Sequence, residues 1–99
     1  MKEINLRGVV PAVVLPMTAN YEPDYQSFAR YLEWIIAEKA VAIAVNMDTG
    51  EGPQLKLSER IKAVETAVQV ANGQVAVVAG VMGGTTGDAV ELSQAYAKA

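Results

Sequence analysis

The residues best suited to do chemistry lie in one short segment, Asp48-Thr49-Gly50-Glu51. The segment follows residues 41–45, a short apolar run, so a carboxylate and a hydroxyl are expected directly after a buried strand. Asp-Thr-Gly in that position is also the signature of aspartic proteases, in which two carboxylates share one proton. An aspartate in a loop also often bonds nearby backbone N–H groups, so a capping role for Asp48 stays open.

Other nucleophiles and metal ligands are scarce. The 99 residues include no cysteine and no histidine, which excludes a thiolate nucleophile, a His-based triad and a zinc site built from them within this chain. An imine-forming lysine needs a pKa lowered by desolvation or by a nearby cation. No lysine lies inside an apolar run, so none is expected to act as the nucleophile: Lys2, Lys39, Lys56, Lys62 and Lys98.

Three apolar runs predict the strands that position this segment. They cover residues 9–15, 41–45 and 75–81. Continuous apolar runs, unlike alternating ones, are typical of strands buried on both faces. Pro11 makes the first strand unusual because it has no N–H to donate to a ladder.

Amphipathic helices are predicted after each strand. Asp24 is placed to cap a helix that extends to about Lys39, with Phe28 and Leu32 on its apolar face. A second helix, capped by Ser58, ends at Asn72-Gly73, and a third begins at Thr85 or Thr86. The tyrosines are interpreted as packing or surface residues: Tyr21, Tyr25, Tyr31 and Tyr96.

Strands that alternate with helices indicate an α/β fold with a parallel sheet, and we treat residues 1–99 as a single domain. Three parallel strands would leave open edges, and the third helix has no stop signal, so a truncated domain is the simpler interpretation.

Composition narrows the classes of function. Hydrophobic residues make up 52% and charged residues 19%, which indicates a globular protein. The net charge of −3 gives no electrostatic reason to bind nucleic acid or an anionic membrane. No apolar run is long enough to span a membrane, and no signal peptide is recognised, so a cytoplasmic location is expected.

Several segments resemble the dihydrodipicolinate synthase/N-acetylneuraminate lyase family. Met47-Asp48-Thr49-Gly50-Glu51-Gly52-Pro53 is similar to the family's Gly-Thr-Thr-Gly-Glu-Ser-Pro segment, and residues 72–80 are similar to its Asn-Gly-Arg-Val-Pro-Val-Ile-Ala-Gly. Leu15-Pro16-Met17 resembles the Thr-Pro-Phe/Met after strand 1. Met47 and Asp48 depart from the family's glycine and threonine, and Val81-Met82-Gly83 departs from its Thr-Gly-Ser/Ala.

The resemblance implies the first three β/α units of a TIM (β/α)₈ barrel and class I aldolase chemistry. In the family, a lysine on a later strand forms a Schiff base with a 2-oxo acid, usually pyruvate, and a tyrosine on another later strand relays protons. Both are absent from this chain, so the chain alone is expected to be inactive. By resemblance, Asp48, Thr49 and Gly50 bind the substrate carboxylate and Glu51 fixes the loop. No cofactor or metal is implied, and the full-length protein is expected to be a homo-oligomer, a dimer or tetramer.

Two alternatives remain. A retroviral-type aspartic protease is disfavoured because those enzymes are almost entirely β-structure, whereas this sequence predicts three helices. The second alternative is a non-catalytic binding module built from part of a barrel.

Overall fold

The computed structural model describes residues 3–82 and 84–99. Its regular elements alternate in type along the chain, and the two strands form one parallel sheet. Ala42 pairs with Ala76, and Val45 pairs with Ala79. This alternation confirms the predicted α/β arrangement. The elements are helix α1 (Tyr25–Ala37), strand β1 (Ala42–Val45), the 3₁₀ helix η1 (Gly52–Gln54), helix α2 (Leu57–Ala71), strand β2 (Ala76–Ala79) and helix α3 (Thr86–Ala97).

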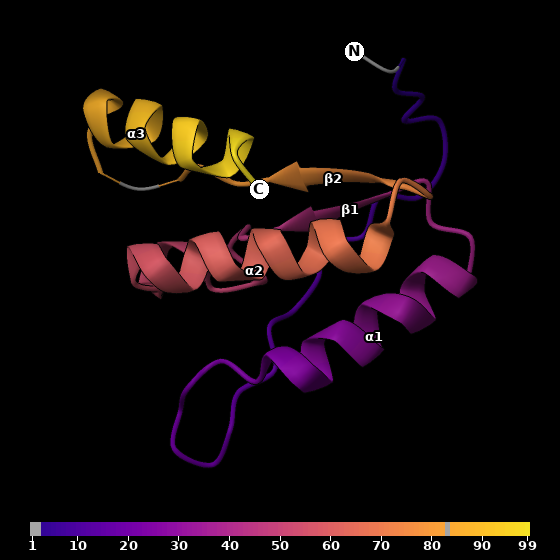
Figure 1. The fold of residues 1–99 in the computed structure, drawn as a ribbon, viewed down its shortest axis with the longest axis horizontal. Helices are drawn as coiled ribbons and strands as arrows, with labels where there is room; N and C mark the ends of the chain where they lie inside the picture. The colour runs from indigo at the N-terminus through magenta and orange to yellow at the C-terminus, as the bar shows by residue number, and fades with distance from the viewer. Residues whose placement is uncertain (1–2, 83) are drawn as a thin grey trace.

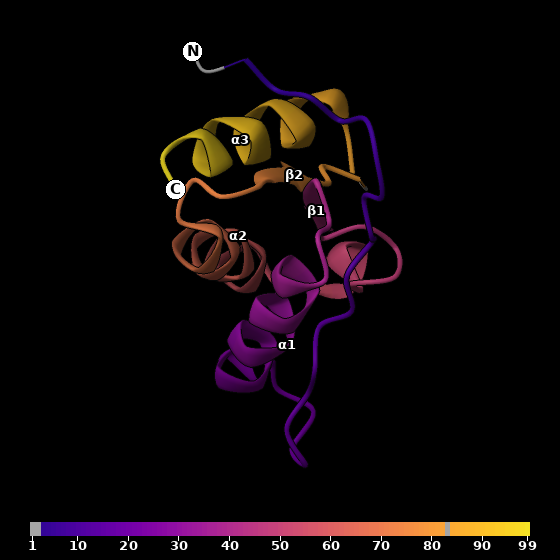
Figure 2. The same cartoon turned by 90° about the vertical axis from the view of Figure 1, so that its right-hand side faces the viewer.

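The expected first strand pairs less regularly than predicted. The Val13 N–H donates to the Ala44 carbonyl over 3.0 Å, and the Ala44 N–H donates to the Pro11 carbonyl over 2.9 Å. Together these bonds make one parallel bridge, between Ala12 and Ala44. The next donor toward β1 would be the N–H of residue 11, which proline lacks. The segment nevertheless runs beside β1, so the order of neighbours follows the order along the chain (Figure 2).

The helices follow one another along one side of the strands, with α2 in contact with both α1 and α3 (Figure 2). Helix α2 packs against both strands and against α1, while α3 lies beyond β2 (Figures 1 and 2). No helix within the described ranges is long and apolar enough to cross a membrane.

Helix α1 begins where the sequence predicts. The Asp24 carboxylate accepts hydrogen bonds from the Ser27 N–H at 3.1 Å and from the Ser27 hydroxyl at 2.7 Å. These bonds satisfy one of the backbone donors that a helix start leaves free. The helix ends at Ala37, slightly before the predicted Lys39.

Helix α2 begins two residues earlier than predicted, so the assignment of Ser58 as its cap is wrong. Lys56 occupies the cap position, and its N–H donates to the Glu59 carboxylate over 2.8 Å. The Glu59 carboxylate thus accepts from the N–H of the cap residue itself, which is one of the two bonds of a capping box. The predicted end is confirmed, because Asn72 has the left-handed φ of 45°. Helix α3 is capped by Thr85, one of the two predicted residues.

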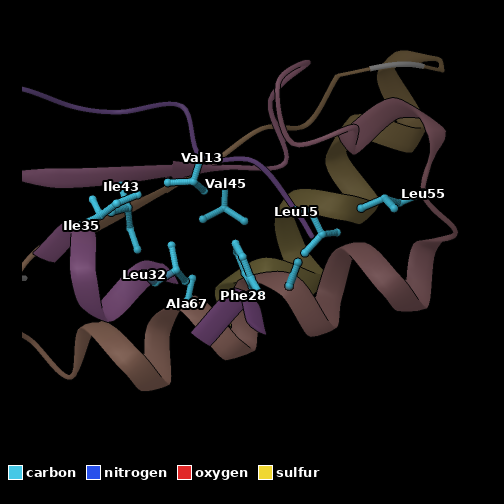
Figure 3. Packing of buried hydrophobic residues seen from close by; sticks show 10 residues of the cluster. Val13, Leu15, Phe28, Leu32, Ile35, Ile43, Val45, Leu55 and Ala67 are labelled. Atoms are coloured by element: carbon cyan, nitrogen blue, oxygen red, sulfur yellow. The ribbon is translucent and has the colours of Figure 1, made fainter. Parts of the chain in front are cut away.

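The core lies between the strands and the first two helices. The side chains of Val13 and Leu15, together with those from β1, point toward those of α1 and α2 (Figure 3). The face of α1 carrying Phe28, Leu32 and Ile35 is buried, as its periodicity predicts. On α2 the buried face is made largely of alanine, and Val68 is 38% exposed. Small side chains allow α2 to approach the strands closely.

Candidate functional site

The predicted site residues form one turn at the carboxyl end of β1. The turn is closed by two bonds to Met47, because the N–H groups of Gly50 and Gly52 both donate to the Met47 carbonyl over 3.1 Å. Asp48 and Thr49 are exposed. Within residues 3–82 and 84–99, their N–H groups donate no hydrogen bond to the chain. The structure therefore places Asp48, Thr49 and Gly50 in one turn, and two adjacent amide N–H groups have no acceptor among the described residues.

Gly50 is required by packing. A Cβ at this position would lie 2.9 Å from the carbonyl oxygen of Val13 and 3.4 Å from the backbone nitrogen of Asn46. The first distance is shorter than real Cβ contacts, so a larger residue would push the turn away from residues 9–15. The close approach of turn and strand segment therefore needs a glycine.

Glu51 acts through its backbone. Its φ is 59°, in the left-handed region, its N–H donates to the Asp48 carbonyl over 3.0 Å, and its own carbonyl accepts from Gln54. Among the described residues nothing donates a hydrogen bond to its exposed carboxylate, so the bonds expected there are not present. The conformation of Glu51 directs the chain into η1.

The Asp48 carboxylate also accepts no hydrogen bond from the described part of the chain, so the alternative that Asp48 caps its own loop is not observed. A negative charge is instead presented at the strand end, beside the Thr49 hydroxyl. This arrangement suits a partner that donates hydrogen bonds.

A buried asparagine that the sequence analysis missed anchors this turn. Asn46 is 3% exposed and has a φ of 61°. Its side-chain Nδ2 donates to the carbonyl of Arg60 over 3.0 Å and to the hydroxyl of Tyr96 over 2.9 Å. The only available signal was a polar residue that ends an apolar run and tolerates the left-handed conformation.

Arg60 and Tyr96 were likewise missed. The guanidinium of Arg60 donates to three backbone carbonyls, those of Pro53 at 2.9 Å, Leu55 at 3.2 Å and Met82 at 3.3 Å. It therefore joins the loop after β1 to the loop after β2. The Tyr96 hydroxyl donates to the Gly80 carbonyl over 3.1 Å. Burial raises the pKa of Tyr96, although the Asn46 hydrogen bond and the Arg60 charge oppose this, so the hydroxyl keeps its proton at neutral pH.

The lysines lie where the sequence indicated. Lys39, Lys56, Lys62 and Lys98 are all exposed, and the Lys62 ammonium lies 4.5 Å from the centre of the Tyr25 ring. Lys2 lies outside the described residues, as does Gly83 of the segment after β2. The described lysines thus lack the desolvated setting that imine formation needs.

A hollow of about 270 Å³ lies next to Arg60, between the start of α2 and α3, and it does not include Asp48, Thr49 or Gly50. Within the described ranges, no group of three or more Asp and Glu side chains is arranged to hold a metal ion. The candidate site is an open loop at the carboxyl ends of parallel strands, the edge at which β/α-barrel enzymes bind their substrates.

Parallel strands that alternate with helices, with the candidate loop at their carboxyl ends, define the class: this chain has the fold of the first units of a TIM-barrel enzyme. Comparison with family models then identifies it more closely. Residues 5–99 match the dihydrodipicolinate synthetase family, and the chain belongs to that family.

Individual relatives agree. The chain is 37% identical to the 4-hydroxy-tetrahydrodipicolinate synthase of Agrobacterium fabrum over 87 residues, 88% of this chain and 30% of that protein. It superposes on dihydrodipicolinate synthase from Bacillus anthracis with a TM-score of 0.92 and 25% identity, covering 97% of this chain and 33% of that one. It superposes on the dihydrodipicolinate synthase from Acinetobacter baumannii in complex with pyruvate with a TM-score of 0.90 and 28% identity. That match covers 95% of this chain and 32% of the other. The chain therefore spans about a third of the length of its relatives.

These relatives are lyases, so the resemblance stated from the sequence is confirmed at the level of family and fold. The fold does not fit the aspartic protease alternative, which requires almost entirely β-structure, because the described chain contains three α-helices and its two strands are parallel.

Proposed function

We propose that residues 46–52 receive the carboxylate of a 2-oxo acid, pyruvate or a close analogue, in a Schiff-base aldolase. The observation that carries this proposal is the turn itself, where the Asp48 and Thr49 N–H groups and the Thr49 hydroxyl are grouped at the end of β1. Consecutive backbone N–H groups in a turn form an anion-binding concavity. A relative of known structure contains pyruvate, which supports the choice of ligand.

The chemistry itself requires groups that the described lysines and tyrosines do not supply. A neutral lysine amine attacks the ketone carbon of the 2-oxo acid, and loss of water gives the imine, whose positive charge on protonation stabilises a carbanion at the neighbouring carbon. In this proposal the lysine and the proton-relaying tyrosine come from other strands of the barrel. The present chain binds and orients the carboxylate, and no cofactor takes part.

The test separates binding from chemistry. Borohydride with pyruvate should leave the mass of the 99-residue chain unchanged. The same treatment should label one lysine in a chimera in which this chain replaces the matching part of the Agrobacterium fabrum enzyme.

Within the chimera, Thr49→Val should weaken pyruvate binding, since it removes the hydroxyl but keeps the shape, and Thr66→Val, on α2 far from the turn, is the matched control. A specific adduct on the chain alone, or a chimera that folds but never forms the imine, would overturn the proposal.

We further infer that Asp48 alters the choice of substrate. Two like unit charges about 4 Å apart repel by roughly 4 kcal/mol at an effective dielectric near 20, and the exposure of Asp48 reduces this figure. A substrate that presents a hydroxyl to Asp48 avoids the repulsion and gains a hydrogen bond. In the chimera, Asp48→Thr should raise the affinity for pyruvate and lower the preference for hydroxylated 2-oxo acids. Unchanged affinity and preference would contradict this role.

Assembly into a homo-oligomer is part of the same proposal. Large apolar side chains stay exposed on the outward-facing helices, including Trp34 at 61% and Val90 at 51%. Such residues are enriched where copies of a protein meet. Sedimentation of the folded chimera should therefore give a dimer or tetramer, and a strict monomer would contradict assembly through these surfaces.

A further inference from the structure

The Asn46 amide has a single possible orientation in its hydrogen bonds. A backbone carbonyl can only accept, so the group that faces the Arg60 carbonyl must be the NH₂ of Asn46. The second N–H of that NH₂ points to the Tyr96 oxygen, which must accept it. The Tyr96 proton is then left to donate to the Gly80 carbonyl. Each donor in this chain of three bonds has one partner.

The chain of bonds joins the ends of both strands. Asn46 is the first residue after β1, and Gly80 is the first residue after β2. The Gly80 N–H also donates to the Val45 carbonyl over 2.8 Å. Tyr96 reaches this point from α3, fifty residues away from Asn46 in sequence. The Tyr96 hydroxyl therefore fixes the side chain of Asn46, the first residue of the 46–52 turn.

There is little space for the turn to relax around Asn46. A Cβ on Gly80 would lie 2.5 Å from the Asn46 carbonyl oxygen, and a Cβ on Gly52 would overlap the same oxygen. The backbone at Gly52 and the backbone at Gly80 thus both pack directly against Asn46. A shift of Asn46 that follows the loss of a side-chain hydrogen bond must therefore also move the turn.

We infer that Tyr96 is a positioning residue for the candidate site, and that it acts through Asn46 on the 46–52 turn. The effect on substrate rests on the proposed function, but the effect on the turn does not. The Tyr96 hydroxyl holds the left-handed conformation of Asn46, which sets the direction in which Asp48 and Thr49 present their N–H groups.

The first test uses amide hydrogen exchange on the 99-residue chain. Tyr96→Phe removes the hydroxyl that accepts from the Asn46 side-chain N–H and donates to the Gly80 carbonyl. Exchange of the backbone N–H groups of Gly52 and Gly80 should therefore accelerate about tenfold, with α1 unaffected. Tyr25→Phe is the matched control, since it removes a half-buried hydroxyl that donates to the Glu59 carbonyl over 3.3 Å. This control should leave the turn unchanged.

A second variant guards against a general loss of structure. Asn46→Gly keeps the left-handed backbone accessible and removes the side chain. It should reproduce the faster exchange of the turn, and the double variant with Tyr96→Phe should add nothing further. Uniform acceleration across the molecule, no change at Gly52, or full additivity would each overturn the inference.

In the chimera, the separate effects on KM and kcat distinguish a positioning role of Tyr96 from a purely structural one. Tyr96→Phe should raise KM for pyruvate several-fold and leave kcat nearly unchanged, because the imine-forming lysine is untouched. If kcat fell equally in Tyr96→Phe and in the control Tyr25→Phe, the proposed effect of Tyr96 on substrate binding would be overturned. If the parent chimera forms no imine, the proposed function fails, and the exchange experiment still decides the role of Tyr96 in the turn.

Discussion

Replacing Arg60 by methionine should loosen both strand-end loops together. The change keeps the length of the side chain and removes three hydrogen bonds from its guanidinium to the carbonyls of Pro53, Leu55 and Met82. Bonds from a charged donor contribute about 1.5–3 kcal/mol each, but two of these are longer than 3.1 Å and the freed carbonyls can bind water. We therefore expect a loss of about 2–3 kcal/mol rather than the full sum.

Urea denaturation measures this loss. With a slope of about 1–3 kcal/mol per molar urea for a small protein, the midpoint should fall by roughly 1–2 M. Arg60→Lys keeps a cation with a single donor group and should lose about half as much. Arg30→Met is the control, because Arg30 is exposed and its one bond, to the Ser27 hydroxyl, is 3.4 Å long. If Arg60→Met behaved like Arg30→Met, Arg60 would not be joining the loops.

Three further outcomes are expected. Phe28→Ala should destabilise the chain by about 3–5 kcal/mol, since Phe28 is 1% exposed. Trp34→Ala, at a position that is 61% exposed, should change the free energy of unfolding by less than about 1 kcal/mol. Equal effects in denaturant titrations would mean that the core is elsewhere. The hydrogen bonds from Ser27 hold the pKa of Asp24 below its ordinary value of 3.8. The stabilisation that the ionised Asp24 gives the folded chain is therefore complete above that pH and is lost as pH falls through the folded pKa. Melting curves of Asp24→Asn should lack this acid-dependent loss of stability. The 99-residue chain should self-associate because Val9 and Val14 are 70% and 45% exposed beside an open sheet edge, and a concentration-independent monomer in sedimentation would contradict this.

Local patterns in the sequence predicted most of the fold. Helix α1 was predictable because Asp24 and the apolar face of Phe28 and Leu32 act within a few residues of one another. The start of α2 was less so, because both Ser58 and Glu59 can satisfy a helix start and the choice depends on where the preceding loop ends. The first strand was overestimated, although Pro11 carried the reason in its missing N–H.

The site was predicted only in part. Asp48, Thr49 and Gly50 are adjacent in sequence, so their grouping followed from position. Asn46 and Tyr96 meet across fifty residues, and nothing local in either segment indicates the other. Which backbone carbonyls Arg60 would reach likewise depends on tertiary geometry. Sequence patterns thus find the residues of the candidate turn more readily than the distant residues that contact it.

The parallel register has a kinetic consequence. Every residue of β1 pairs with the residue 34 positions later, from Ala42–Ala76 to Val45–Ala79. Bringing such distant segments together costs a flexible chain about 3 kcal/mol in closure entropy before any strand bond is gained. Formation of α2 shortens the connection, so the barrier to folding should be crossed with that helix already packed on α1. During synthesis, β1 has no regular partner strand until β2 has left the ribosome, and its unpaired backbone is most exposed to misassembly in that interval.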